Sequence, residues 1–98
     1  MNFEWDEHKR QANIRKHGFD FKSAEVIFNA PMLTRLDMRS DYGEDRWVGI
    51  GMTINRVVVV VYLEYDDSET IRIISLRKAL NYEQKQYERY ISYRLGTG

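Results

Sequence analysis

The stretch Glu-Thr-Ile-Arg-Ile-Ile-Ser-Leu-Arg-Lys-Ala-Leu at residues 69–80 decides how the rest of the chain is interpreted. Its β-branched residues favour a strand over 69–77, and the polar run that follows favours a helix. Arg72 and Arg77 lie inside this strand or at its end. An arginine there must reach water, pair with an acid or meet the negative charge of a ligand. Because Lys78 and a basic helix come next, the segment favours an anion-binding face; solvated or ion-paired arginines are the plainer alternative.

Three upstream segments alternate as strands do: residues 32–38, 46–53 and 57–65. Short turns join them to one another and to 69–77, which predicts an antiparallel meander. Residues 57–65 are apolar on both sides, so we expect this strand at the centre of the sheet. In 46–53 we expect Val48, Ile50 and Met52 to face inward, with Trp47, Gly49 and Gly51 opposite. The two glycines on one face leave room for a helix or a ligand to approach closely.

Capping residues mark two helices near the start of the chain, after a short edge strand at residues 3–5. Asp6 is suited to begin a helix over 7–17 that ends before Gly18, and Asp20 is suited to begin a second helix over 20–28. The second helix carries an apolar stripe that we expect to face the sheet, made of Phe21, Ala24, Ile27 and Phe28.

A third helix is predicted over 82–94, with Asn81 as its N-cap. Its expected packing stripe is Tyr87, Tyr90, Ile91 and Leu95. The order β-α-α-β-β-β-β-α predicts an α+β fold: a small twisted antiparallel sheet of four to five strands, two N-terminal helices and one C-terminal helix. We expect one domain over 1–98, with 96–98 as a frayed tail. The residues predicted to be buried are Ile50, Val59, Val61, Ile73 and Phe28.

The composition of the 98 residues narrows the function classes. There is no cysteine, which excludes disulfides and thiolate metal sites. No apolar run approaches the about 18 residues of a membrane helix, and no signal sequence opens the chain, so we expect a cytoplasmic protein. Net charge is zero, yet residues 29–71 hold four Lys/Arg against eight Asp/Glu, and residues 72–98 hold six against two. Such a basic end suits a polyanion and the acidic middle a basic partner, unless folding mixes the two.

Metal chemistry is not suggested by the sequence, since His8 and His17 form no i, i+4 pair with each other. RNA cleavage can proceed without a metal site, because the 2′-hydroxyl of the RNA is an internal nucleophile. The protein then has to supply only a base, an acid and cations around the phosphate. His17 is a candidate for proton transfer or simply a helix-end cation. Glu83 is a candidate base, a partner for Arg77 or a first-turn acid. Tyr87 is suited either to stack on a base or to pack in the core.

These residues carry a resemblance to a known family. The motifs are Phe-Glu-Trp-Asp at 3–6, Lys9, Asn13, Lys-His-Gly at 16–18, Phe21, Ala24, Val-Ile-Phe at 26–28 and Ile-Arg-Ile-Ile-Ser-x-Arg at 71–77. Together they resemble the BrnT family of ribonuclease toxins from bacterial type II toxin–antitoxin pairs, whose fold is similar to that of the RelE and ParE toxins. The chain departs from the family pattern at Leu76, where alanine is common, at Asn29, where aspartate is common, and at Tyr82, where a basic residue is frequent.

The resemblance implies a metal-independent endoribonuclease that acts through the 2′-hydroxyl, needs no cofactor and inhibits translation. It implies a BrnA-like ribbon-helix-helix antitoxin as partner, two of each chain in the complex, and DNA contact only through the antitoxin. The catalytic candidates that match the family are Lys9, His17, Arg72, Arg77, Glu83 and Tyr87, with base and acid left open. Cations expected to bind RNA are Lys16, Lys78, Lys85 and Arg89. The competing hypotheses are a non-catalytic protein-binding domain and a gyrase-directed toxin of the ParE branch.

Overall fold

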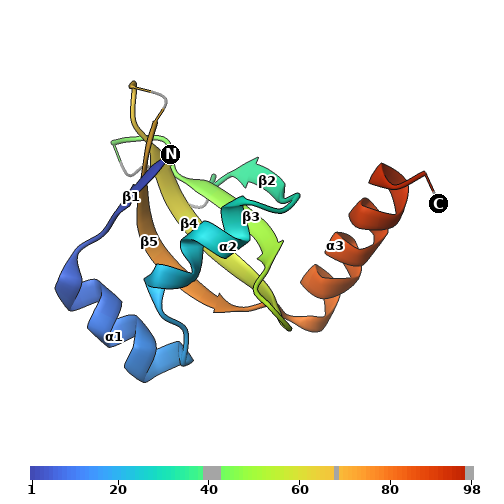
Figure 1. The fold of residues 1–98 in the computed structure, drawn as a ribbon, viewed down its shortest axis with the longest axis horizontal. Coiled ribbons are helices and arrows are strands. Elements are labelled where there is room, and N and C mark those ends of the chain that lie inside the picture. The colour runs from blue at the N-terminus through green and yellow to red at the C-terminus, as the bar shows by residue number, and fades with distance from the viewer. Residues whose placement is uncertain (39–42, 68, 97–98) are drawn as a thin grey trace.

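The computed structural model describes residues 1–38, 43–67 and 69–96, and confirms an α+β architecture (Figure 1). None of the helices in these ranges has the length and apolar character that crossing a membrane requires. The predicted tail 96–98 lies outside the described residues except for Gly96. In chain order the elements are β1 (Asn2–Glu4), α1 (Glu7–His17), the short 3-10 helix η1 (Phe21–Ser23), α2 (Ala24–Phe28), β2 (Leu33–Leu36), β3 (Trp47–Met52), β4 (Val57–Glu64), β5 (Thr70–Lys78) and α3 (Asn81–Arg94).

The strands form one five-stranded sheet in the order β1-β5-β4-β3-β2. Strands β2 to β5 make the predicted antiparallel meander, and β4 is its central strand. The prediction of an entirely antiparallel sheet is wrong at β1, which pairs with β5 in parallel, Phe3 opposite Ile71. The sheet is therefore mixed. The sequence of a three-residue strand does not indicate whether it pairs in parallel or antiparallel, because its partner strand lies far away in the sequence.

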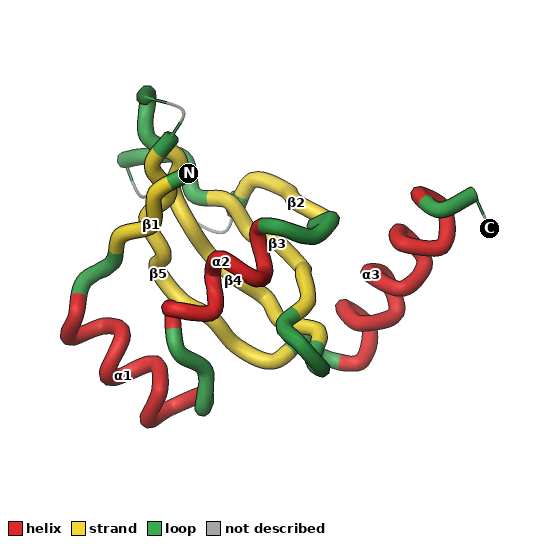
Figure 2. Tube along the Cα trace, in the orientation of Figure 1, coloured by secondary structure: helices red, strands yellow, loops and turns green. Residues whose placement is uncertain are grey.

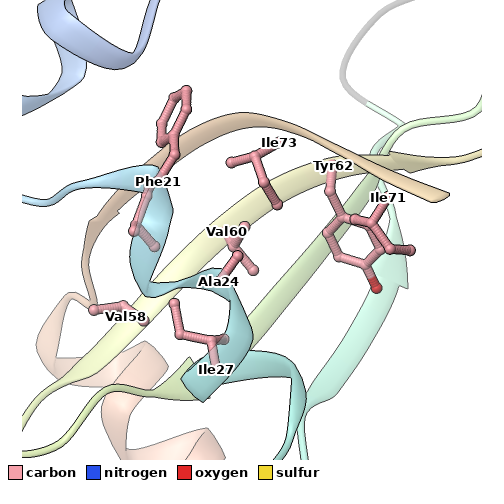
Figure 3. Packing of buried hydrophobic residues seen from close by; sticks show 9 residues of the cluster. Phe21, Ala24, Ile27, Val58, Val60, Tyr62, Ile71 and Ile73 are labelled. Atoms are coloured by element: carbon pink, nitrogen blue, oxygen red, sulfur yellow. The ribbon is translucent and has the colours of Figure 1, made fainter. Parts of the chain in front are cut away.

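One side of the sheet, called here the first face, is sealed by η1 and α2 (Figure 3). Phe21, Ala24 and Ile27 lie against a floor of strand residues that includes Val58 and Val60, and all five are at most 2% exposed. Gly51 permits this approach as predicted, because a Cβ there would lie 2.9 Å from the Cγ2 atom of Ile27. The predicted stripe therefore packs as expected, Phe28 included. Phe28 is only half-buried, however, so the prediction that it is buried is wrong.

The helix predicted over 20–28 divides into two pieces. Asp20 accepts a hydrogen bond from the backbone N–H of Lys22, and this tight cap opens the 3-10 turn η1 before α2 begins. Asp6 and Gly18 bound α1 as predicted: Asp6 accepts from the backbone N–H of Lys9, and Gly18 adopts a φ of 77°.

The opposite side, called here the second face, is covered less completely. Its buried residues are Val48, Ile50, Val57, Val59, Ala79 and Tyr87. Figure 2 shows why: the N-terminal end of α3 lies near the sheet, and the rest of the helix extends away from the sheet. Two inward-facing predictions are therefore wrong, since Leu95 is 73% and Met52 39% exposed. Val61, also predicted to be buried, is half-buried here, while Ile50, Val59 and Ile73 are buried as expected.

Helix α1 is fixed to the sheet by a side chain that sequence reasoning left without a structural role. The buried Asn13 amide donates hydrogen bonds to the carbonyls of Phe19 and Leu76, at 2.9 and 2.8 Å, and its oxygen accepts from the Leu76 N–H at 3.1 Å. The Asn13 amide thus satisfies backbone N–H and C=O groups of β5 at the edge of the sheet, past the point where β1 ends and no strand of the described ranges pairs with them. The polar character of α1 follows, because this anchor needs little apolar burial.

Candidate active site

A β-bulge determines where the two arginines of β5 project. They are five residues apart, so in an unbroken strand they would point to opposite faces. Val61 pairs with Ser75 and Tyr62 with Ile73, which leaves Ile74 as the extra residue. As a result Arg72, opposite Leu63, and Arg77, opposite Val59, both lie on the second face.

Arg77 is held by a carboxylate at the start of α3. Its two terminal nitrogens donate to the two oxygens of Glu83 at 2.8 and 2.9 Å, a bidentate pair. The Glu83 side chain is 5% exposed, whereas that of Arg77 is 35% exposed. Glu83 also accepts from the backbone N–H of Leu80, which makes Leu80 the N-cap of α3 in place of the predicted Asn81. One buried acid therefore positions both a helix start and a solvent-facing cation.

The charge state of Glu83 follows from these contacts. The hydrogen bonds from Arg77, then the backbone N–H of Leu80 and the charge of Arg35, hold the pKa of Glu83 below its ordinary value, against the opposing effect of burial. A carboxylate with a lowered pKa is a weak base. Of the three roles open to Glu83, its geometry favours those of partner to Arg77 and first-turn acid over that of base.

Arg72 has its own partners at the other end of β5. It donates to the Glu4 carboxylate on β1 at 3.3 Å, and the Tyr65 hydroxyl donates to the same oxygen. These bonds, Tyr65 first, hold the pKa of Glu4 below its ordinary value. Five residues of strand place Arg72 and Arg77 about 16 Å apart at the backbone. Since their acids draw them toward β1 and α3 respectively, contact with one phosphate requires at least one of them to leave its carboxylate.

Arg35 on β2 joins this face, although sequence reasoning did not select it. It pairs in register with Val48, on the same side as Arg77, and its charge contributes to the lowered pKa of Glu83. The signal was present in the alternation of 32–38, which placed Arg35 opposite Thr34 and Leu36. This alternation does not indicate which end of the strand α3 approaches, so it could not predict that Arg35 lies near Glu83.

Tyr87 has a structural role in the described geometry. It is 5% exposed, and its hydroxyl donates to the carbonyl of Pro31 at 3.0 Å. Burial raises its pKa. Of the two alternatives, packing in the core describes this conformation.

The α1 candidates approach β5 from its free edge. Lys9 and His17 lie one turn before and one turn after Asn13, so the three residues form one stripe of the helix. Asn13 is bonded to Leu76, the residue before Arg77, which places the stripe beside the end of β5. His17 is half-buried there, while Lys9 and Lys16 are exposed. Figure 1 shows α1 and α3 on opposite sides of the view, with the end of β5 between them.

The remaining cations expected to bind RNA are exposed. Lys78 ends β5, and Lys85 and Arg89 lie on α3. On a helix they project from the flank opposite Tyr87 and Ile91. In the described ranges, no group of three or more His, Cys, Asp or Glu side chains is arranged to hold a metal ion.

The site combines a carboxylate-held arginine on an open sheet face with a histidine-bearing helix at the strand edge, a set suited to phosphate chemistry. Comparison with known families agrees with that class. Residues 5–83 match the family described as "Ribonuclease toxin, BrnT, of type II toxin-antitoxin system". The chain belongs to this family of ribonuclease toxins, and an antitoxin partner is implied by the type of system. A search of curated proteins found no match.

Proposed function

We propose that this chain is a metal-independent endoribonuclease whose site lies where the end of β5 meets α1 and α3. The observation that carries the proposal is the bidentate Arg77–Glu83 pair, because a cation fixed by a buried acid yet open to solvent is preorganised for a phosphate. Family membership supports the substrate class.

Arg77 would stabilise the charge that develops on the phosphate oxygens when the 2′-hydroxyl attacks. Glu83 holds the guanidinium in position. The group best placed to move a proton is His17, since its turn of α1 is anchored beside Leu76 through Asn13. The proton leaves the 2′-hydroxyl, the departing 5′-oxygen takes one up, and a 2′,3′-cyclic phosphate remains. Lys9, Lys16 and Arg72 would bind flanking phosphates.

The biological setting is part of the same proposal. RNA cleavage would inhibit translation in the cytoplasm until a BrnA-like ribbon-helix-helix antitoxin binds the toxin. We propose a complex of two toxins and two antitoxins, with DNA contacted only through the antitoxin. Co-purification with the product of an adjacent reading frame and determination of the complex mass test this assembly, and tight sequence-specific DNA binding by this chain alone would contradict it.

The direct test is cleavage of RNA by the purified protein, with products analysed for cyclic phosphate. Arg77→Lys keeps the charge but loses the bidentate geometry, and should lower kcat about 100-fold. His17→Asn should lower it about 100-fold or more, and its matched control is His8→Asn at the exposed start of the same helix. EDTA should leave the rate unchanged. Wild-type rates in both Arg77→Lys and His17→Asn, or loss of activity in EDTA, would refute the mechanism.

A further inference from the structure

A groove with a volume of about 580 Å³ lies between α3 and the turn that joins β3 to β4. This volume is within the range of small-molecule and cofactor sites. Its floor is apolar and comes from both sides: Val57 from β4, and Tyr87 and Ile91 from α3. Val57 and Tyr87 are buried and Ile91 half-buried, so the floor belongs to the core of the second face. The groove exists because α3 leaves the sheet instead of lying across it.

The rim of the groove is polar and carries more positive than negative charge. Arg56 and Lys78 stand on it, together with the side-chain amides of Asn55 and Gln84. Among the described residues that line the groove the acid is Glu88, which accepts a hydrogen bond from Gln84 at 3.2 Å. An apolar floor accommodates the face of an aromatic ring, amides pair with the edge of a base, and cations attract phosphate. A nucleotide combines these three features.

The groove adjoins the proposed site through two pairs of chain neighbours. Lys78 on the rim follows Arg77, and Gln84 on the rim follows Glu83. Arg77 also donates to the backbone carbonyl of Lys78 at 3.2 Å, so the strand end that holds the proposed catalytic arginine forms one wall of the groove. A chain of RNA with one phosphate at Arg77 has its neighbouring nucleotide within reach of this hollow.

We propose that the groove binds one nucleotide of the RNA substrate, next to the phosphate at Arg77. The base lies on Val57, Tyr87 and Ile91, its edge meets Asn55 or Gln84, and its phosphate meets Arg56 and Lys78. This inference rests on the proposed function for its substrate. A segment of a protein partner is the competing occupant, and the charge balance of the rim favours the nucleotide.

The first test does not depend on cleavage. Amide chemical shifts of the ¹⁵N-labelled full chain are followed by NMR during titration with each of the four ribonucleoside monophosphates. Shifts should centre on Asn55, Arg56 and Gln84. Gln84→Trp fills the groove from an exposed position and should abolish them, whereas Gln86→Trp, exposed on another flank of α3, should not. Absence of shifts in the wild-type chain, or shifts that persist in Gln84→Trp, would overturn the assignment.

The second test separates this inference from the proposed function. With cleavable RNA, Gln84→Trp should raise KM about tenfold and leave kcat within about twofold, because the groove would bind ground state and transition state alike. Arg56→Gln should weaken binding of a 2′-O-methyl RNA and reduce its salt slope by about 0.7; Arg15→Gln on α1 is the control. If RNA is cleaved but Gln84→Trp leaves KM unchanged, the groove inference fails and the function stands. Loss of antitoxin binding in Gln84→Trp with unchanged RNA affinity would assign the groove to the protein partner.

Discussion

The two faces of the sheet are built on different principles. The first face is closed by η1 and α2, and its central residues Phe21, Ile27 and Val58 are each 0% exposed. The second face has a smaller buried cluster, and α3 covers only part of it. A charged pair, Arg77 with Glu83, ties the helix to the strand there. Burial therefore fixes the fold on one side, while the other side keeps polar groups accessible.

Identical substitutions on the two faces of β4 give the largest expected contrast in stability. Val58→Ala removes two methyl groups from a site without exposure and should lower the free energy of unfolding by about 2–3 kcal/mol. Val61→Ala makes the same change on the half-buried second face and should cost about 1 kcal/mol or less. Urea unfolding at equilibrium measures both. Equal losses would show that the second face is closed as tightly as the first.

A smaller effect is expected from Glu83→Gln, which tests whether charge holds the second face. The substitution removes the ion pair with Arg77 and should lower the free energy of unfolding by about 1–2 kcal/mol at neutral pH, a value reduced by the partial exposure of Arg77. Because the folded-state pKa of Glu83 lies below its ordinary value of 4.5, this contribution is present above that pH. It is lost as the pH falls through the folded-state value.

The difference between wild type and Glu83→Gln should therefore shrink in acid, as measured by thermal unfolding across a pH series. Glu88→Gln on the exposed side of α3 is the control and should change little at any pH. A difference for Glu83→Gln that is constant from neutral to acidic pH would assign the effect to packing instead of charge.

The smallest effect is expected at Arg72. Its pair with Glu4 is open to solvent, with side chains 32% and 41% exposed, and exposed pairs contribute little and are screened by salt. Arg72→Gln should leave the midpoint of thermal unfolding nearly unchanged in high salt and lower it slightly in low salt. A large loss that salt does not reduce would contradict this prediction and would show that Arg72 holds β1 to β5 through packing or hydrogen bonding and not through an exposed charge pair.

Local patterns in the sequence were sufficient for most of the fold. The valine-rich run predicted the central strand, and Asp6 and Gly18 predicted the bounds of α1, because these signals depend on nearest neighbours and on burial. Gly49 and Gly51 predicted the close approach of a helix or a ligand, and a helix residue, Ile27 of α2, does lie close to Gly51. The direction of β1 and the position of Leu95 could not be predicted, since both depend on which distant segment lies alongside.

For the candidate site, the sequence supplied the residue types and the family motif, and it indicated Arg77 and Glu83 as one possible pair. It did not place Arg72 and Arg77 on one face: a regular strand would separate them, and only the extra residue Ile74 brings them together. The approach of α1 through Asn13 was equally invisible, because a hydrogen bond across 63 residues leaves no periodic signal. Composition and periodicity determine which elements form and which sides are apolar. Tertiary structure alone decides the register, and the register decides which charges meet.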